Sequence, residues 1–386
     1  MDIIFWQVMP SHHQSGAIRH LAEIWPGQVF AVYDMEMLES RKSLGWQPPN
    51  MGKVECFYLN NKEHPALFVQ NIVKEHIDAI HVLGGFRGCL SSRLAWHELR
   101  KRSNARLSCI AERPRLAGNL KSTILAPLWY WSFFLRHGKR FKAVLAMGEL
   151  GVQCFTKLGC PEDILFPYKY QVDFIHDSIL NSFPCEACED SLSKKVRFVY
   201  VGRFDQGKGV DLILAALDSL PGAWTMDWIG QGGDLEPLVR ASADGKQVRF
   251  LGAVPSDQVV RCLRSYDVCL VPSRYDGWGM MTNEALLAGL GLVVSDEVGS
   301  KDLVFASGSG KVVAAGSACA LRTTLLDILD HPKQLEEWKK RAQAYHKRIT
   351  PVVVGQYLSD VLNYTFIKNG ADRPDAPWLT FLHEMD

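Results

Sequence analysis

The chain has 386 residues, of which 47% are hydrophobic and 22% charged, and its net charge is +1. This length allows two domains with full-sized cores, and the composition excludes a disordered or fibrous chain. No apolar run approaches the roughly 18 to 20 residues that a membrane-spanning helix needs. Residues 1–8 lack the basic start and the small-residue cleavage site of a secretory signal, so we expect a cytoplasmic protein.

The first half of the chain alternates strand patterns with helical patterns, which is typical of a doubly wound α/β domain. Strands are predicted at residues 3–8, 29–33, 79–83, 106–111 and 143–147. Helices are predicted at residues 17–24, 90–102 and 129–140. We expect the strand at residues 143–147 to be the last strand of this half.

From residue 196 the alternation restarts, which predicts a second and independent α/β unit. Its strands are predicted at residues 196–202, 224–229, 248–252, 268–271 and 292–295. A long helical region at residues 318–348 closes this unit. Thr350 and Pro351 break that helix, and another helix is expected at residues 353–367.

One strand-loop-helix stretch, residues 267–289, has the chemistry of an anion site. The first turn of a helix has N–H groups without internal partners and a partial positive charge. The backbone from Gly279 to Thr282 can therefore receive a phosphate. Glu284, about one turn further on, is placed to hold a neighbouring pair of hydroxyls.

A second loop of this kind follows the strand at residues 196–202. Arg203 and Lys208 stand there, five residues apart, beside Gly202 and Gly207. Arginine offers a planar fork for phosphate oxygens, and lysine offers a mobile point charge. Either cation alone would more often be a solvated surface residue, but their joint spacing beside glycines favours phosphate binding. Two such loops at strand ends indicate a diphosphate held at the edge of the sheet.

Four blocks of sequence carry a family resemblance. They are Gly-Arg-x4-Lys-Gly at 202–209, Gly-x-Gly at 230–232, Phe-Leu-Gly at 250–252 and acidic-x7-Glu at 276–284. In this order, they resemble the donor domain of the retaining GT-B glycosyltransferases of family 4. The resemblance covers about a quarter of the chain.

The resemblance implies an α/β chain with the GT-B fold, in which two Rossmann-like doubly wound domains face a central cleft. A C-terminal helix would return to the N-terminal domain. The chain would cross between the domains near residues 166–169. The expected domains are an acceptor-binding domain at 1–168, a nucleotide-sugar donor-binding domain at 169–350, and a C-terminal helix and tail at 351–386.

The resemblance also implies roles in the donor domain. Arg203 and Lys208 would stabilise the charge that develops on the departing nucleotide diphosphate. Asp276 stands where the family has glutamate, and it would contact the donor sugar. As a turn residue before Gly277 it would have no chemical role, but we favour the sugar contact. The expected donor-binding residues are Gly202, Gly232, Gly252, Gly279, Met280, Met281, Thr282 and Glu284.

Because protein cations and a helix start supply positive charge, we expect no metal and no cofactor other than the nucleotide diphosphate sugar as co-substrate. The sequence contains no Asp-x-Asp pair, the usual metal-holding signal of the other large glycosyltransferase fold. Cys185 and Cys188 have the spacing of half a zinc site, but no second pair accompanies them.

The loop after the first strand departs from the family. Many members have a Gly-Gly pair there, whereas this chain has His12, His13, Gln14 and a single glycine, Gly16. These four residues are candidates for acceptor binding. A histidine pair in such a loop is, however, often no more than polar lining.

Glu112 stands where many relatives carry a histidine. Its carboxylate could accept a hydrogen bond from a sugar, or deprotonate the acceptor hydroxyl as a catalytic base. It could equally pair with Arg113 or Arg115 and have no chemical role.

Residues 86–142 contain thirteen Lys and Arg and two acidic residues, a net charge of +11, so the rest of the chain carries −10. A solvated basic face, nucleic-acid binding and attachment to an anionic membrane surface are the open interpretations. No nucleic-acid motif accompanies the charge, so we expect no nucleic-acid partner. The aromatic and aliphatic residues 128–135, next to a basic cluster, favour an interfacial segment unless their rings are simply core.

These expectations combine into a metal-independent retaining hexosyltransferase. It would move a sugar from a nucleotide diphosphate sugar to a hydroxyl of a glycan or lipid-linked acceptor in cell-surface polysaccharide biosynthesis, of lipopolysaccharide or exopolysaccharide. The expected setting is the cytoplasm, peripheral to the inner face of the cell membrane. The alternatives are a GT-B nucleotide-sugar epimerase and a catalytically silent partner that only binds a nucleotide sugar.

Overall fold

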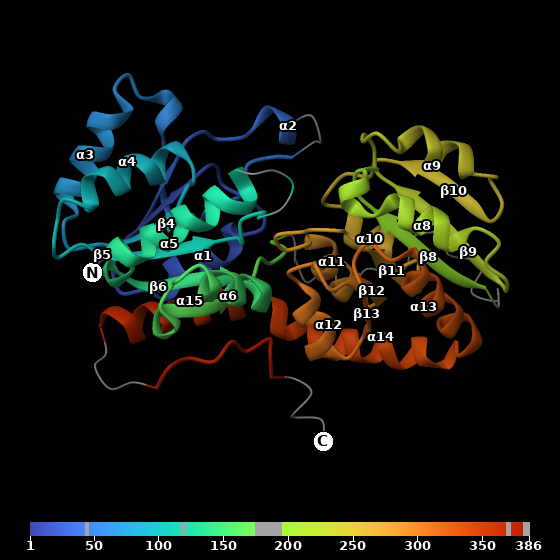
Figure 1. The fold of residues 1–386 in the computed structure, drawn as a ribbon. Helices are drawn as coiled ribbons and strands as arrows, with labels where there is room; N and C mark the ends of the chain where they lie inside the picture. The colour runs from blue at the N-terminus through green and yellow to red at the C-terminus, as the bar shows by residue number, and fades with distance from the viewer. Residues whose placement is uncertain (43–45, 117, 119–120, 174–194, 368–371, 381–386) are drawn as a thin grey trace. The chain divides into compact units, whose positions relative to one another are not determined.

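The computed structural model describes residues 1–42, 46–116, 118, 121–173, 195–367 and 372–380 (Figure 1). The chain forms two compact units. The first combines Met1–Asp173 with Thr350–Pro377, and the second combines Phe174–Ile349 with Trp378–Asp386. The sequence analysis placed the corresponding boundaries after residues 168 and 350.

The first unit contains a seven-stranded, wholly parallel sheet in the order β3-β2-β1-β4-β5-β6-β7. The predicted doubly wound α/β architecture is therefore confirmed for this unit. Its strands are β1 (Ile3–Gln7), β2 (Val29–Tyr33), β3 (Glu55–Tyr58), β4 (Ile80–Gly84), β5 (Arg106–Ala111), β6 (Phe141–Met147) and β7 (Leu165–Tyr168).

Helices cover both faces of this sheet. Apolar residues of α3 to α6 pack with Ile4 and Trp6 in one core. Crossovers between parallel strands are right-handed in nearly all proteins, which puts α1 on the opposite face. The helices of this unit are α1 (Ser15–Ile24), α2 (Glu39–Lys42), α3 (Pro65–Glu75), α4 (Leu90–Leu99), α5 (Ala126–His137), α6 (Gly148–Lys157) and α15 (Pro351–Phe366).

Two expectations about the first unit were wrong. The strand at 143–147 is not the last, because β7 pairs in parallel with β6. Pro167 lies inside β7, and this is tolerated because an edge strand needs N–H donors on one side only. The sequence analysis also missed β3, whose residues are exposed or only half-buried and so lack a clear apolar pattern.

The second unit contains a six-stranded sheet in the order β10-β9-β8-β11-β12-β13, again parallel throughout. Its strands are β8 (Val196–Val201), β9 (Trp224–Ile229), β10 (Val248–Gly252), β11 (Val268–Val271), β12 (Gly291–Ser295) and β13 (Gly310–Val313). Its helices are α8 (Val210–Leu217), α9 (Glu236–Ser242), α10 (Val259–Leu263), α11 (Met280–Ala288), α12 (Lys301–Ser307), α13 (Ala318–Asp330) and α14 (Lys333–Tyr345).

The predicted helical region at 318–348 consists of two helices, α13 and α14, and Pro332 is the N-cap of α14. Proline at a helix start costs nothing, but inside a continuous helix it would remove a backbone hydrogen bond. The edge strand β13 was not predicted.

The C-terminal helix α15 returns to the first unit, as expected, and packs against α1 and β6. Glycine permits this approach. A Cβ on Gly355 would lie 2.7 Å from the carbonyl oxygen of Ala17 and 2.9 Å from Cβ of His20. A Cβ on Gly16 would lie 2.8 Å from Cβ of Pro351. The two helices therefore touch through their backbones.

None of the helices in the described residues is long and apolar enough to cross a membrane.

We predict that Gly355→Val destabilises the protein by about 1–3 kcal/mol, because the new side chain overlaps the backbone of α1. Urea unfolding measures this loss. Val352→Ala, on the exposed face of the same helix, is the control and should change stability by less than about 0.5 kcal/mol. Equal stability of Gly355→Val and the unmodified protein would contradict the tight contact.

Candidate functional site

Each sheet has a point where its strand order reverses, and ligands of open α/β sheets bind outside the strand ends at such points. In the second unit this point lies between β8 and β11, which pair directly. The loops that follow these two strands contain both predicted phosphate-binding segments.

An ion pair joins the two loops. The Lys208 ammonium lies 2.5 Å from Oδ2 of Asp276, and 39% of the Lys208 side chain is exposed. The Asp205 carboxylate accepts a hydrogen bond from the Lys208 backbone N–H at 3.0 Å and so caps the short turn that carries the lysine. Two predicted catalytic residues, 68 positions apart, are thus in direct contact.

A second ion pair fixes the same loops and was missed by the sequence analysis. Arg274 donates to both carboxylate oxygens of Asp211 at 2.7 Å and to the carbonyl oxygen of Gln206 at 2.6 Å. Gly209 lies beside them with φ +73°, and a Cβ there would lie 2.1 Å from the carbonyl oxygen of Pro272. This arginine clamps the loop after β11 onto the loop after β8.

The start of α11 is built from buried contacts. Gly279 precedes the helix with φ +89°, and a Cβ there would lie 2.5 Å from Val298. The indole N–H of Trp278 donates to the Asn283 side chain at 2.8 Å. Asn283 therefore holds a buried tryptophan rather than capping the helix.

Only part of the predicted anion site is available to a ligand. The Thr282 backbone N–H donates to the carbonyl oxygen of Gly279 at 3.1 Å, and its buried hydroxyl lies 2.8 Å from that of Ser300. The first N–H groups of a helix have no partner inside it, which leaves the amides of Met280 and Met281. Thr282 shapes the site without facing a ligand.

Glu284 lies one turn into α11 and is partly buried. No hydrogen bond or ion pair joins its carboxyl group to another of the described residues. Burial raises the pKa of Glu284 to about 8, so the group is largely protonated at neutral pH. A neutral carboxyl group both donates and accepts hydrogen bonds, which suits a ligand rich in hydroxyls.

The remaining predicted donor residues lie in loops around this edge of the sheet. Gly202 follows β8, Gly232 follows β9 and Gly252 ends β10. The backbone N–H of Gly232 donates to the Glu236 carboxylate at 2.5 Å. Arg203 is 72% exposed and lies 3.5 Å from Asp205, so the structure does not bring it into contact with Lys208 or Asp276.

The first unit has a cavity of about 490 Å³ at its own point of strand reversal, between β1 and β4. We call it the acceptor cavity, after the acceptor-binding residues that the sequence analysis predicted. Residues that follow β1, β4 and β5 form most of its wall. Its lining residues are Gln7, Val8, Met9, Ser11, His13, Gln14, Leu38, Arg41, Gly84, Gly85, Phe86, Arg87, Gly88, Ile110, Ala111, Glu112, Tyr130 and Tyr170.

Two of the four acceptor-binding candidates line this cavity. His13 and Gln14 are in its wall, whereas His12 is buried with its ring against Trp46, and Gly16 is buried in α1. Burial, followed by the charge of Arg41, lowers the pKa of His13 to about 3. His13 is therefore a neutral hydrogen-bonding group at physiological pH.

Glu112 also lines the cavity. Its Oε1 accepts a hydrogen bond from the Tyr170 hydroxyl at 2.7 Å. Burial and the neighbouring Glu112 raise the pKa of Tyr170 well above its usual value, so Tyr170 remains a donor. Arg41, Arg87 and Tyr170 were not predicted as part of this site, because no motif links the separate segments that carry them.

The two closely spaced cysteines, Cys185 and Cys188, lie outside the described residues. In the residues that are described, no group of three or more His, Cys, Asp or Glu side chains is placed to hold a metal ion.

Residues 189–345 match the family model of the glycosyl transferases group 1. This segment is similar to the glycosyl transferases of group 1. Lys208, Asp276 and Glu284 all lie within it, as does the Arg274–Asp211 clamp.

Curated relatives share part of their length with this chain. It is 30% identical over 159 residues to a glycogen synthase of Mycobacterium tuberculosis, covering 39% of this chain and 37% of that protein. It is 31% identical over 190 residues to a phosphatidyl-myo-inositol mannosyltransferase of Mycobacterium leprae, covering 46% and 49%. The chain therefore matches less than half the length of these relatives.

The structural likeness extends beyond the segment that the family model matches. HepE from Anabaena, solved in complex with UDP, matches with a TM-score of 0.70 over 94% of this chain and 100% of that chain, at 15% identity. At this identity the likeness shows the fold alone. That fold is GT-B, as the sequence resemblance implied.

We predict that Glu284→Gln stabilises the second unit increasingly as pH rises. The pKa of Glu284 is raised from 4.5 to about 8, so the native state binds more protons than the unfolded state between these values. Stability must therefore fall as pH rises through this window. Each pKa unit is worth about 1.4 kcal/mol, which limits the effect to less than about 5 kcal/mol.

Urea unfolding at about pH 5 and about pH 8 tests this prediction. The stability advantage of Glu284→Gln over the unmodified protein should grow from the lower to the higher pH. An advantage that does not change with pH would show that the Glu284 pKa is close to its ordinary value.

Proposed function

We propose that the protein is a retaining glycosyltransferase that moves a sugar from a nucleotide diphosphate sugar to a hydroxyl of a glycan or lipid-linked acceptor. The contact between Lys208 and Asp276, beside the start of α11, is the observation that carries this proposal. It places a cation, a carboxylate and free helix amides at one strand reversal, where a diphosphate and its sugar would be held together.

Each donor-site group has a defined task in this proposal. The Lys208 ammonium and the amides of Met280 and Met281 would stabilise the negative charge on the departing diphosphate. Arg203 is an exposed cation that would join them when the ligand binds. Glu284, protonated and without a partner among the described residues, would bind neighbouring hydroxyls of the nucleotide. The solved complexes of HepE contain UDP and UDP-glucose, which supports a nucleotide-sugar donor.

No metal ion is needed in this scheme, because protein groups supply the positive charge. Asp276 would contact the donor sugar, with its charge balanced by Lys208 at 2.5 Å. Retention of the anomeric configuration requires only a single carboxylate near the sugar in this scheme. The acceptor hydroxyl attacks from the face that the phosphate leaves, and the leaving phosphate takes its proton. A nucleophilic mechanism would require a second carboxylate about 5 Å from the first.

The acceptor would bind in the acceptor cavity of the first unit. Glu112, held by Tyr170, and the neutral His13 are hydrogen-bonding groups suited to sugar hydroxyls. The names of two relatives support a glycan or lipid acceptor: the phosphatidyl-myo-inositol mannosyltransferase and a glycosyltransferase of amylovoran biosynthesis from Erwinia amylovora. A role in cell-surface polysaccharide biosynthesis is part of this proposal.

We place the enzyme in the cytoplasm at the inner face of the cell membrane. The basic segment 86–142 would provide the attraction to an anionic membrane surface, at about 1 kcal/mol for each basic residue near the lipid.

Incubation with radiolabelled nucleotide sugars and membrane extract separates this function from its alternatives. A transferase moves label into lipid or glycan. An epimerase converts the nucleotide sugar without any acceptor, and a silent binding partner does neither. Either of the last two results would overturn the proposal.

We predict that Lys208→Ala and Glu284→Ala each abolish the thermal stabilisation that UDP or UDP-glucose gives to the protein. A ligand at 100 times its Kd should stabilise by about 2.7 kcal/mol. Lys246→Ala is the matched control, because Lys246 is an exposed lysine in a separate loop of the same unit. Full binding by both Lys208→Ala and Glu284→Ala would disprove the donor-site assignment.

We predict that Glu112→Gln lowers transfer about tenfold, the value of one hydrogen bond, and leaves UDP binding unchanged. Tyr170→Phe should have a similar effect, because it frees Glu112 from its position in the cavity wall. A loss of about 10²- to 10⁴-fold in Glu112→Gln, with a changed pH–rate profile, would instead identify Glu112 as a catalytic base.

A further inference from the structure

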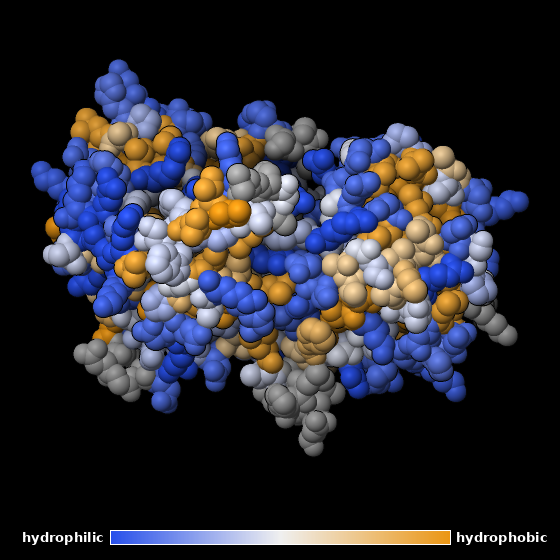
Figure 2. Space-filling model, in the orientation of Figure 1, coloured by the Kyte–Doolittle hydropathy of each residue, from blue (hydrophilic) through white to orange (hydrophobic). Residues whose placement is uncertain are grey.

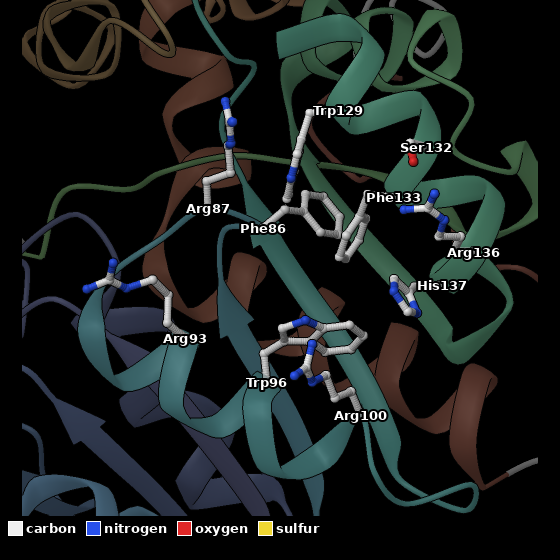
Figure 3. Close-up of a pocket in the computed structure, with 10 residues that line it drawn as sticks. All are labelled: Phe86, Arg87, Arg93, Trp96, Arg100, Trp129, Ser132, Phe133, Arg136 and His137. Carbon is white, nitrogen blue, oxygen red and sulfur yellow. The ribbon is translucent and has the colours of Figure 1, made fainter. Parts of the chain in front are cut away.

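A second cavity of about 460 Å³ opens between α4 and α5 of the first unit (Figure 3). We call it the arginine pocket. Nothing in the proposed reaction uses it. Its lining residues are Phe86, Arg87, Arg93, Trp96, Arg100, Trp129, Ser132, Phe133, Arg136 and His137.

Packed aromatic rings form the floor of the pocket. Trp129 stacks on Phe133 with ring centres 5.1 Å apart, and Phe133 lies 5.5 Å from both Phe86 and Trp96. These rings also belong to, or pack against, the main core of the unit. The predicted alternative, that Trp129, Phe133 and Phe134 are core residues, is correct for Phe133 and Phe134, whereas Trp129 is partly buried and packs against that core.

Four arginines surround this floor. The Arg87 guanidinium lies 4.5 Å from the centre of the Trp129 ring, and Arg100 contacts His97 at 3.4 Å. In Figure 3 the Arg136 guanidinium points toward the aromatic rings, whereas that of Arg93 points away from them. Across the described part of the chain, no carboxylate forms an ion pair with any of the four.

The residues that line the pocket therefore include no carboxylate to balance its positive charge. The nearest acidic residue of α4, Glu98, pairs with Lys101 at 2.9 Å and lies 3.9 Å from His97. Burial, and after it the charges of Arg140, Arg100 and Arg136, lowers the pKa of His137. A pocket with unbalanced guanidinium groups is suited to an anion with several oxygens, above all a phosphate.

The outer face of α5 is apolar and exposed. Leu128, Trp131 and Leu135 are spaced three and four residues apart, so they share one face of the helix, and Leu135 is 71% exposed. Figure 2 shows hydrophobic side chains gathered on the surface over α5. An exposed apolar stripe beside a basic pocket is the arrangement of a helix that lies in a lipid interface.

The arginine pocket and the acceptor cavity share two wall residues, Phe86 and Arg87. A smaller hollow lined by Gly85, Phe86, Gly88 and Trp96, among others, lies against the same residues. A ligand with its charged group in the arginine pocket can therefore extend past Arg87 toward Glu112.

We propose that the arginine pocket binds the phosphate group of a lipid-linked acceptor, with the lipid chain along the exposed face of α5 and the sugar end in the acceptor cavity. This inference rests on the proposed transferase function and names the class of its acceptor. The apolar stripe selects a lipid rather than a free phosphate, since a water-soluble anion would gain nothing from Leu128, Trp131 and Leu135.

Flotation with lipid vesicles tests the proposal. The probe is a phosphatidylcholine vesicle that carries polyprenyl phosphate as its minor and only anionic lipid, at physiological ionic strength. Charges more than about 8 Å apart are screened there, so direct contacts with the phosphate dominate. The protein should bind these vesicles and not pure phosphatidylcholine.

The decisive variant is Arg100→Gln with Arg136→Gln. Its matched control is Lys139→Gln with Lys142→Gln, which removes the same charge from exposed residues of the same segment that do not line the pocket. We expect the arginine variant to bind at least about tenfold more weakly, and the lysine variant to bind almost as the unmodified protein does. Equal losses of vesicle binding in the two variants would show a diffuse attraction to the membrane surface. That result would overturn the proposed phosphate binding by the arginine pocket.

A third variant, Leu128→Ser with Leu135→Ser, tests whether the lipid chain binds along the exposed face of α5. We expect it to lose vesicle binding by a similar factor. Unchanged binding in this variant, together with complete displacement of the protein from vesicles by inorganic phosphate, would show a site for free phosphate and refute the lipid assignment.

The UDP-induced thermal shift, measured on all variants, separates the two proposals and confirms folding. It should be unchanged in each variant, because the substitutions lie in the first unit. If UDP stabilises none of the proteins but the arginine variant still loses vesicle binding, the donor function fails and the lipid-phosphate site stands. If UDP binds and vesicle binding is the same in every variant, only the further inference fails.

Discussion

The parallel pairing of β8 with β11 is the constraint on which the candidate donor site depends. Strands from positions about 70 residues apart end at one edge of the sheet, so the loops that follow them must meet. Lys208 and Asp276 come into contact there, and Arg274 bridges to Asp211. Strand pairing thus brings the loops together, and the charged side chains on those loops then form the site.

One carboxyl group at this edge of the sheet, that of Glu284, lowers the stability of the folded protein. Glu284 has no partner among the described residues, and burial raises its pKa to about 8. A buried carboxyl group without a partner destabilises a fold unless a ligand later satisfies it. The neighbouring groups are fully satisfied in contrast, because Trp278 bonds to Asn283 and Thr282 lies against Ser300. The polar groups around Glu284 are therefore satisfied by each other, whereas the carboxyl group of Glu284 can still form hydrogen bonds with a ligand.

In the first unit a strand reversal again brings distant loops together, but these loops carry different side chains. Its strand reversal between β1 and β4 opens a cavity lined by hydrogen-bonding groups, among them His13 and the Glu112–Tyr170 pair. Beside it, the arginines of the arginine pocket surround an aromatic floor, and no carboxylate among the described residues forms an ion pair with them. Four of the thirteen basic residues in 86–142 thus line one pocket.

The sequence by itself determined the α/β fold class and predicted the residues of the candidate donor loops, because glycine, cation and helix-start signals are local and lie within a few positions of one another. It located ten of the thirteen strands of the two sheets at least approximately. It could not find β3, or that β7 and β13 are strands of the sheets, since short edge strands carry weak apolar patterns. Only the tertiary structure decided that Glu112 bonds to Tyr170, that Thr282 and Gly16 are buried, and that Arg274 is a clamp. These facts depend on contacts between distant segments, and strand pairing and helix packing set those contacts.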